Sequence, residues 1–69
     1  MSVYKVVELV GTSPTSWEEA AKSAVAAASA SLCDLRIAEV SDLDMQIDDG
    51  AVVALRAKVK VSFKHEAGT

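Results

Sequence analysis

Two rows of polar side chains in the second half of the chain carry the residue types with the clearest binding chemistry. The acidic row consists of Asp42, Asp44, Gln46, Asp48 and Asp49, and the basic row consists of Arg56, Lys58, Lys60 and Lys64. Hard cations such as calcium prefer carboxylate and carbonyl oxygens. A row of ammonium and guanidinium groups suits a phosphate-bearing anion. The sequence therefore offers material for a cation site and for an anion site.

The acidic row has a superficial likeness to an EF-hand calcium loop in the segment "DMQIDDG". As a single-chain motif it fails, because the glycine falls one place late and no bidentate Glu follows at the required distance. Two interpretations stay open. Asp42, Asp44 and Asp48 contribute to a calcium site shared between protomers, or they form an ordinary turn with charges that keep an edge strand soluble.

The basic row also has two interpretations. Arg56, Lys58 and Lys60 are candidates for holding a nucleotide or cofactor phosphate, in a site that symmetry could make multivalent. Alternatively, the row is a solvated strand face whose charges are balanced by Asp42 and Asp44 across a hairpin.

The remaining reactive residues do not assemble into a catalytic site. Cys33 is the single cysteine, so it has no disulfide partner within the chain and is expected to be an inert, buried or half-buried thiol. His65, the single histidine, falls near the C-terminus. Ser13, Thr15 and Ser16 are expected to cap a helix, since no histidine-based triad can be built around them. The sequence predicts a protein that is not an enzyme.

A strand and a helix precede the polar rows. Residues 3–10, "VYKVVELV", are rich in valine and are bounded by Gly11, which predicts a strand. A helix is expected from about Ser16 to about Leu32. Thr15 with Glu18, or Ser16 with Glu19, has the spacing of a capping box at its start.

The inner face of this helix carries few large side chains. Trp17, Ala21, Ala24, Ala28 and Leu32 recur at helical spacing. A face made mostly of alanine predicts that a sheet or a neighbouring chain packs at short distance. Trp17, in the first turn, is either a platform for a ligand or a packing anchor over the sheet or a subunit contact.

Two alternating segments, 35–47 and 51–63, predict a hairpin around Asp48-Asp49-Gly50. Parity favours a three-residue loop with Gly50 in the left-handed position, because a two-residue loop would set apolar side chains opposite charged ones. The expected pairs are Ile47 with Ala51, Met45 with Val53, Leu43 with Leu55 and Asp42 with Arg56. Glu39 and Ser41 break the apolar face, which indicates either a bulge or, as the preferred explanation, a strand that extends beyond its own protomer.

The expected fold is α+β, with the order β-α-β-β in one domain over residues 1–69 and a frayed tail from about residue 65. In a wholly antiparallel sheet the most apolar segment, 51–63, lies in the centre. A chain of 69 residues without a disulfide framework or a zinc cluster usually needs another source of stability, so oligomerisation is expected.

The net charge of −3 disfavours nucleic acid as a partner. No targeting segment, lipidation motif or membrane-spanning run is recognisable in the sequence, so a soluble, cytoplasmic protein that does not bind membranes is expected.

The segments "VYKVVELVGTSPTSWEEAA", "DLRIAEV" and "DGAVVALRAKVKVSFK" closely resemble the dodecin family, in register over about residues 3 to 66. The resemblance implies a three-stranded antiparallel sheet curled around one helix, and twelve protomers in a hollow shell of cubic symmetry. It also implies non-catalytic storage of riboflavin or its phosphate, FMN. Some dodecin relatives that do not bind flavin look to be calcium binders, which implies calcium as the alternative ligand.

The residues that define the flavin site in this family are replaced. The position of the stacking Trp falls on Ile37, and the position of the hydrogen-bonding Gln falls on Arg56. Ile37 keeps apolar area but lacks a π face, and Arg56 keeps donors but lacks the amide acceptor. The resemblance therefore predicts an altered flavin pocket at Ile37 and Arg56, with the assembly itself independent of these two side chains.

Overall fold

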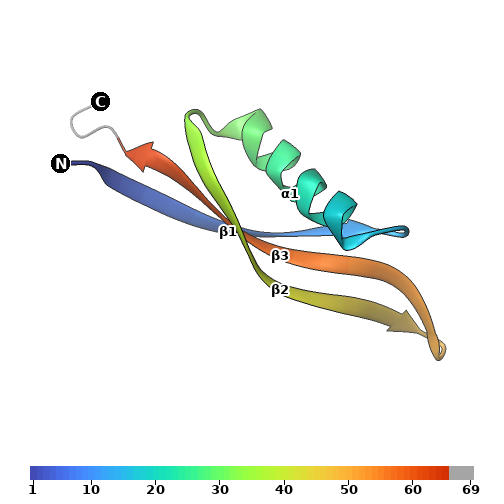
Figure 1. Cartoon of the computed structure of the whole chain (residues 1–69). Coiled ribbons are helices and arrows are strands. Elements are labelled where there is room, and N and C mark those ends of the chain that lie inside the picture. Colours follow the sequence, from blue (N-terminus) through green and yellow to red (C-terminus); the bar gives the residue numbers. More distant parts are fainter. Residues whose placement is uncertain (66–69) are drawn as a thin grey trace.

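The computed structural model describes residues 1–65 as a sheet of three strands covered on one face by a helix (Figure 1). The elements are β1 (Val3–Ser13), α1 (Trp17–Ser31), β2 (Leu35–Asp48) and β3 (Ala51–His65). The sheet is antiparallel with the order β1-β3-β2, so the predicted fold class and the central position of β3 are confirmed. Strand β3 reaches His65, and the rest of the predicted tail, 66–69, lies outside the described residues.

Helix α1 begins at a serine cap. The Ser16 Oγ accepts a hydrogen bond from the Glu19 N–H at 3.0 Å, which selects Ser16 over Thr15 as the N-cap. The Ser16 N–H donates to the Ser13 Oγ at 3.3 Å, where a complete capping box would place the Glu19 carboxylate. At the other end the Leu32 N–H donates to the Ala28 carbonyl at 2.8 Å. The predicted limits of the helix are confirmed.

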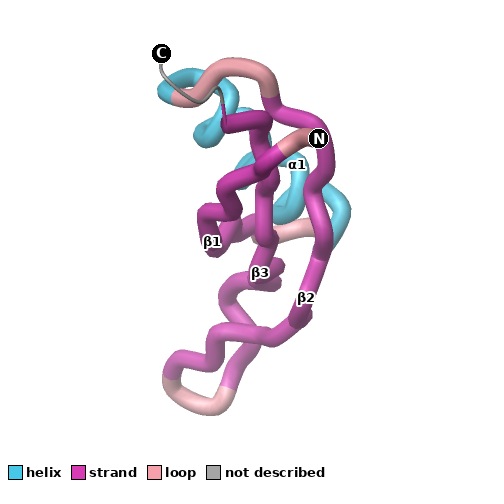
Figure 2. The backbone as a smooth tube through the Cα atoms, turned by 90° about the vertical axis from the view of Figure 1, so that its left-hand side faces the viewer, coloured by secondary structure: helices cyan, strands magenta, loops and turns pink. Residues whose placement is uncertain are grey.

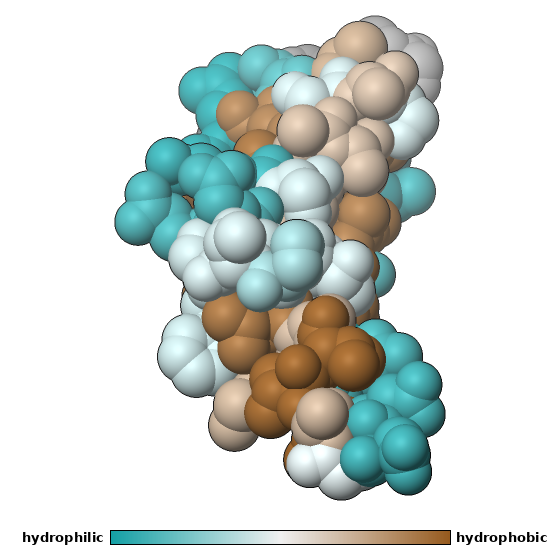
Figure 3. Space-filling view, turned by 90° about the vertical axis from the view of Figure 1, so that its right-hand side faces the viewer, coloured by the Kyte–Doolittle hydropathy of each residue, from teal (hydrophilic) through white to brown (hydrophobic). Residues whose placement is uncertain are grey.

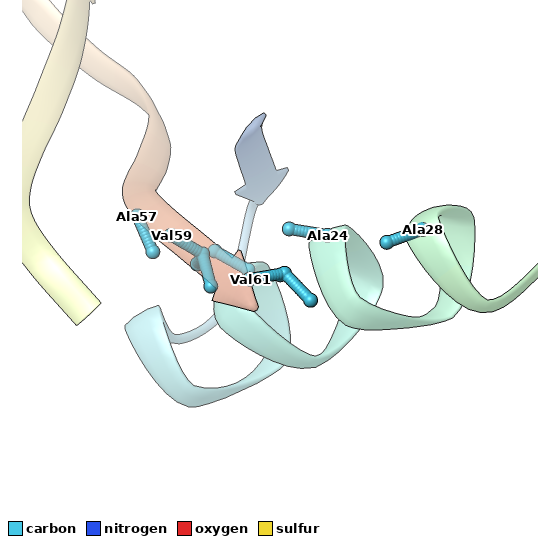
Figure 4. Packing of buried hydrophobic residues seen from close by; sticks show 6 residues of the cluster. Ala24, Ala28, Ala57, Val59 and Val61 are labelled. Atoms are coloured by element: carbon cyan, nitrogen blue, oxygen red, sulfur yellow. The ribbon is translucent and has the colours of Figure 1, made fainter. Parts of the chain in front are cut away.

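The core between α1 and the sheet is built almost entirely from small side chains. Its buried members are Ala20, Ala24 and Ala28 from the helix and Ala57, Val59 and Val61 from β3 (Figure 4). Strand β1 runs through Gly11 to Ser13 instead of ending at residue 10. A Cβ at Gly11 would collide with the Ala20 carbonyl oxygen and lie 2.9 Å from the Ser23 Oγ, so the helix crosses the strand almost in backbone contact.

The turn between β2 and β3 has two residues, and the predicted three-residue loop is wrong. Asp48 pairs with Ala51, while Asp49 and Gly50 have φ angles of 52° and 78°. Two successive positive φ angles fit the type I′ hairpin turn, which Asp-Gly favours. The register then shifts at Val53, because Ile47 pairs with Val52 and Gln46 pairs with Ala54. A two-residue loop alone would set apolar side chains opposite charged ones. The turn and this bulge together place apolar residues opposite apolar residues again.

The restored parity keeps the predicted faces of Leu43, Met45 and Arg56 but displaces their partners, and Ile47 pairs with Val52 instead of Ala51. Met45 lies opposite Leu55, and Leu43 lies opposite Ala57. Asp44, and not Asp42, lies opposite Arg56. These last three pairs are each two positions away from the expected ones.

Two irregularities in β2 explain the residues that broke the apolar pattern. The register shifts between Leu35 and Ile37 and again between Val40 and Asp42. Between these points Glu39 lies opposite Lys60, on the sheet face that points away from the helix. Ser41 occupies the second bulge, and its Oγ donates to the Lys58 carbonyl at 3.2 Å. A bulge is thus present, and the preferred extension into another protomer stays a prediction.

The β2–β3 hairpin extends past the helix and gives the molecule an elongated shape, with principal extents of 51 × 19 × 16 Å (Figures 1 and 2). We call the part of this hairpin from residue 42 to residue 56 the arm. Within residues 1–65, no helix has the length and apolar character needed to cross a membrane.

Candidate functional site

The polar rows lie together on the sheet face that points away from α1. Residues directly opposite each other in an antiparallel pair share a face, and the buried residues of β3 are Ala57, Val59 and Val61. The intervening side chains of β3 therefore point away from the helix, together with their partners on β2. This outer face contains Ile37, Glu39, Asp42, Asp44, Arg56, Lys58 and Lys60. The structure thus brings both predicted rows to one surface.

Asp44 and Arg56 form a two-pronged ion pair across the arm. The Arg56 Nε donates to the Asp44 Oδ1 at 2.7 Å, and the Arg56 Nη2 donates to the Asp44 Oδ2 at 3.0 Å. A planar guanidinium matches a carboxylate in this geometry, which a lysine could not reproduce. About half of each side chain is exposed, 42% for Arg56 and 50% for Asp44, so water screens the pair.

The ion pair shifts the pKa of both groups in the direction that favours their charged forms. The hydrogen bonds from Arg56 lower the pKa of the Asp44 carboxyl, with a smaller contribution from the positive charges of Arg56 and Lys58. The hydrogen bonds to Asp44 raise the pKa of the Arg56 guanidinium. Asp44 is therefore a carboxylate throughout the physiological pH range and is available to a cation only in competition with Arg56.

Trp17 fixes the backbone of the arm at the same residue. The indole Nε1 donates to the Asp44 carbonyl oxygen at 3.1 Å, across 27 positions of the sequence. Trp17 remains 37% exposed at the first turn of α1. The packing-anchor interpretation of Trp17 is supported, and its partner is the arm. Neither periodicity nor local spacing in the sequence indicated this contact.

The acidic row supplies donors of the kind that calcium prefers, but one chain does not gather enough of them. Asp42, Asp44, Gln46 and Asp48 alternate along β2, and side chains two positions apart on a strand are separated by roughly 6.6 Å. Calcium needs six to eight oxygens at about 2.3–2.6 Å, so a straight strand presents too few of them to one ion. Among residues 1–65, no three acidic, histidine or cysteine side chains cluster as a metal site.

Lys58 and Lys60 of the basic row have acidic residues opposite them on the neighbouring strands. Lys58 lies opposite Asp42 on β2 and opposite Val10 on β1, while Lys60 lies opposite Glu39 and Glu8. Within the described part of the chain, the ion pairs join Lys22 to Glu18, Arg36 to Asp34 and Arg56 to Asp44. Lys58 therefore faces one carboxylate and Lys60 faces two, and within residues 1–65 neither lysine makes a direct ion pair.

The structure does not bring Ile37 and Arg56 together within one chain. Ile37 is 66% exposed and pairs with Ser62, six positions along β3 from Arg56, which corresponds to roughly 20 Å. Ile37 lies on the outer face, because the irregularity at Arg36 changes the parity of β2 at this point. Ile37 borders a shallow pocket of about 200 Å³, lined also by Val25, Leu35, Arg36, Ala38 and Val61.

Large apolar side chains are exposed on the arm. Leu43, Met45, Ile47, Val52 and Val53 are each exposed by 48–65%. The space-filling view shows apolar surface gathered towards the hairpin end of the molecule, beside a hydrophilic patch (Figure 3). Exposed patches of this kind commonly mark protein–protein contacts.

Cys33 is also exposed, so the expectation of a buried or half-buried thiol is wrong.

Comparison with known proteins gives one family over almost the whole chain. The model of the dodecin family matches residues 3–66. A curated relative, the calcium dodecin of Mycobacterium tuberculosis strain ATCC 25618 / H37Rv, is 52% identical over 64 residues, which cover 93% of this chain and 90% of the relative.

Solved structures agree with this match. The crystal structure of the M. tuberculosis calcium dodecin, described as calcium chelating with a novel calcium-binding site, aligns with a TM-score of 0.84 at 47% identity and covers 99% of this chain and 97% of its own. The dodecin of Streptomyces coelicolor aligns with a TM-score of 0.88 at 37% identity, covering 97% and 96% of the two chains. The dodecin of Streptomyces davaonensis gives 0.85 at 31% identity, with 94% and 96% covered.

Proposed function

The chain belongs to the dodecin family, and from this premise we propose that it is a non-catalytic binding protein whose ligand is calcium. The observation that carries the proposal is the outer-face row of oxygen donors on β2, in a chain 52% identical to a protein named calcium dodecin. Asp42, Asp44 and Asp48 supply carboxylates to the ion. Calcium needs more oxygens than one straight strand offers, so a second copy of the chain completes the site.

The proposed assembly is the hollow shell of twelve protomers that the family resemblance implies. The monomer supports an assembly because its buried core consists of six small side chains, while five large apolar side chains of the arm are exposed. Contact between arms would cover these side chains, and Leu43, Met45 and Ile47 among them alternate with the acidic row along β2 and point to the opposite face. An ion held between two copies would bind the assembly and not the single chain, and would therefore stabilise the assembly.

A calorimetric titration of the purified assembly with calcium, repeated with magnesium, tests the proposed function. We expect saturable binding of calcium and weaker binding of magnesium, because the smaller ion demands stricter octahedral geometry. Asp42→Asn and Asp44→Asn should each weaken binding by roughly tenfold or more, since each removes a charged oxygen ligand.

Glu39→Gln is the matched control, because Glu39 lies on the same strand and face but opposite Lys60, away from the arm. It removes the same charge and should change the calcium affinity by less than about twofold. Equal losses in all three variants would show general attraction by the protein's charge, and the proposed site would be wrong.

Flavin, or a phosphorylated cofactor held by the basic row, is the second candidate ligand. Lys58 and Lys60 keep this candidate open, because neither is held in a direct ion pair among residues 1–65. Two observations favour calcium over this candidate. Arg56 already donates to Asp44, and Ile37 lies roughly 20 Å along the sheet from Arg56 in one chain. Saturable quenching of riboflavin or FMN fluorescence by the assembly would reverse this order.

A further inference from the structure

The Arg56 side chain occupies the carboxylate that the proposed cation site requires. We infer that Arg56 is a tethered cation that competes with a divalent ion for Asp44 and thereby lowers the calcium affinity of the site. This inference rests on the proposed function, and it concerns how the site is regulated. A divalent ion that binds both carboxylate oxygens of Asp44 must displace the Arg56 guanidinium.

The geometry makes the competition direct. Both Asp44 oxygens accept hydrogen bonds from Arg56, at 2.7 and 3.0 Å. A metal ion coordinated by both oxygens would have to occupy the side of the carboxylate on which the two guanidinium nitrogens now lie. Arg56 and the ion therefore exclude each other at this carboxylate.

Within residues 1–65, no second carboxylate lies directly opposite Arg56 in the sheet. Its partner on β1 is Thr12, and its partner on β2 is Asp44. The neighbouring β2 carboxylate, Asp42, lies opposite Lys58. When an ion takes Asp44, Arg56 turns into solvent, which its 42% exposure already allows. The exchange therefore needs a change of side-chain rotamer and no change in the fold.

Trp17 fixes the backbone at Asp44 during this exchange, and its fluorescence provides a signal for the exchange. The Trp17 Nε1 binds the main-chain carbonyl of Asp44, and this bond leaves the carboxylate free to change partner. Trp17 is the single tryptophan of the chain. Its fluorescence consequently reports the electrostatic change at one residue, without interference from other indoles.

The test compares calcium titrations of the wild-type assembly, Arg56→Gln and Arg36→Gln, followed by calorimetry and by Trp17 fluorescence. Arg36→Gln is the matched control, since it removes one arginine from a half-exposed ion pair with Asp34 at 3.0 Å, at the opposite end of β2. We expect Arg56→Gln to bind calcium roughly three- to fivefold more tightly than wild type, and Arg36→Gln to change affinity by less than about 1.5-fold.

Two further variants separate competition from a general charge effect. In an Asp44→Asn background, Arg56→Gln should give no gain beyond that of Arg36→Gln, because no carboxylate remains to compete for. Arg56→Lys keeps the positive charge but cannot form the two-pronged ion pair with Asp44. It should therefore show part of the increase in calcium affinity expected for Arg56→Gln. Light scattering of each variant checks that its assembly mass equals that of wild type.

The outcomes distinguish the inference from the proposed function. Calcium binding by wild type with equal affinities in Arg56→Gln and Arg36→Gln would overturn the competition and leave the calcium function standing. Binding by Arg56→Gln alone would support the competition strongly. An absence of calcium binding in every variant would overturn the calcium function and the inference with it.

Discussion

The helix-covered part of the sheet and the arm follow opposite rules of composition. Under the helix, small residues such as Gly11, Ala24 and Ala57 are buried and the backbones lie almost in contact. On the arm, large residues such as Met45 and Ile47 are exposed by half or more. A self-sufficient small domain would bury its large side chains. This difference indicates that the covered part establishes the fold of one chain, whereas the arm is suited to contacts with other chains.

The largest expected effect is on the covered part, from Gly11→Ala. The new methyl group would collide with the Ala20 carbonyl oxygen, a backbone atom that cannot rotate away. We expect a loss of about 3 kcal/mol or more in the free energy of unfolding, measured by urea denaturation.

Gly50→Ala is the contrasting change on the arm. Gly50 has a φ of 78°, and a Cβ there would have no neighbour within 4 Å among residues 1–65, so the cost comes from backbone conformation alone. It should be about 1 kcal/mol. Equal losses for the two glycine variants would contradict the close approach of α1 to β1.

The second effect is overpacking of the helix face by Ala24→Leu. Ala24 is 3% exposed and packs in the core of small side chains shown in Figure 4. Three additional carbon atoms should destabilise the fold by roughly 2 kcal/mol. Ala26→Leu, at an exposed position of the same helix, should change the stability of the folded chain by less than about 0.5 kcal/mol. A well-folded Ala24→Leu protein of unchanged stability would refute the packing argument.

A smaller effect joins the two regions, through Trp17→Phe. The substitution keeps an aromatic ring in the first turn and removes the hydrogen bond to the Asp44 carbonyl. We expect a loss of about 1 kcal/mol and faster amide hydrogen exchange in the arm, with exchange in the core of β3 unchanged. Uniform acceleration across the sheet would indicate that Trp17 supports the whole fold and not the arm.

The smallest expected effect is the pH dependence of the Asp44–Arg56 ion pair. Because the pKa of Asp44 is lowered in the folded chain, the pair stabilises the fold above the pKa of the unfolded carboxyl. This contribution is lost as the pH falls through the lowered folded pKa. Wild type should therefore melt slightly higher than Arg56→Gln at neutral pH, and the two melting temperatures should converge in acid. A difference that persists in acid would mean that Arg56 stabilises the chain by another contact.

The sequence predicts the covered part well because its signals are local. Ser16 caps the helix, the alanine face lies against the sheet, and β3 occupies the centre of the sheet. Each of these follows from short-range spacing or from strand hydrophobicity. The family resemblance, carried by motifs along the chain, is confirmed by the match over residues 3–66.

The sequence predicts the arm less completely because bulges leave little trace in composition. The faces of the acidic and basic rows are correct, but the two-residue turn and the bulge at Val53 together move the partner of Arg56 from Asp42 to Asp44. The change of parity at Glu39 was a visible signal for the bulges of β2. By contrast, the bond from Trp17 to Asp44 joins residues 27 positions apart and has no sequence signal.

The most direct test of the account measures bound calcium and molar mass together. Wild type and Ile47→Asp, which places a charge on the exposed apolar side of the arm, are passed through a sizing column equilibrated with calcium. Light scattering gives the mass of each peak, and elemental analysis gives its calcium above the buffer level. We predict calcium bound to the wild-type oligomer and none to a folded Ile47→Asp monomer, because each site needs two copies. A monomer that retains calcium at the same ratio per chain would contradict the shared site.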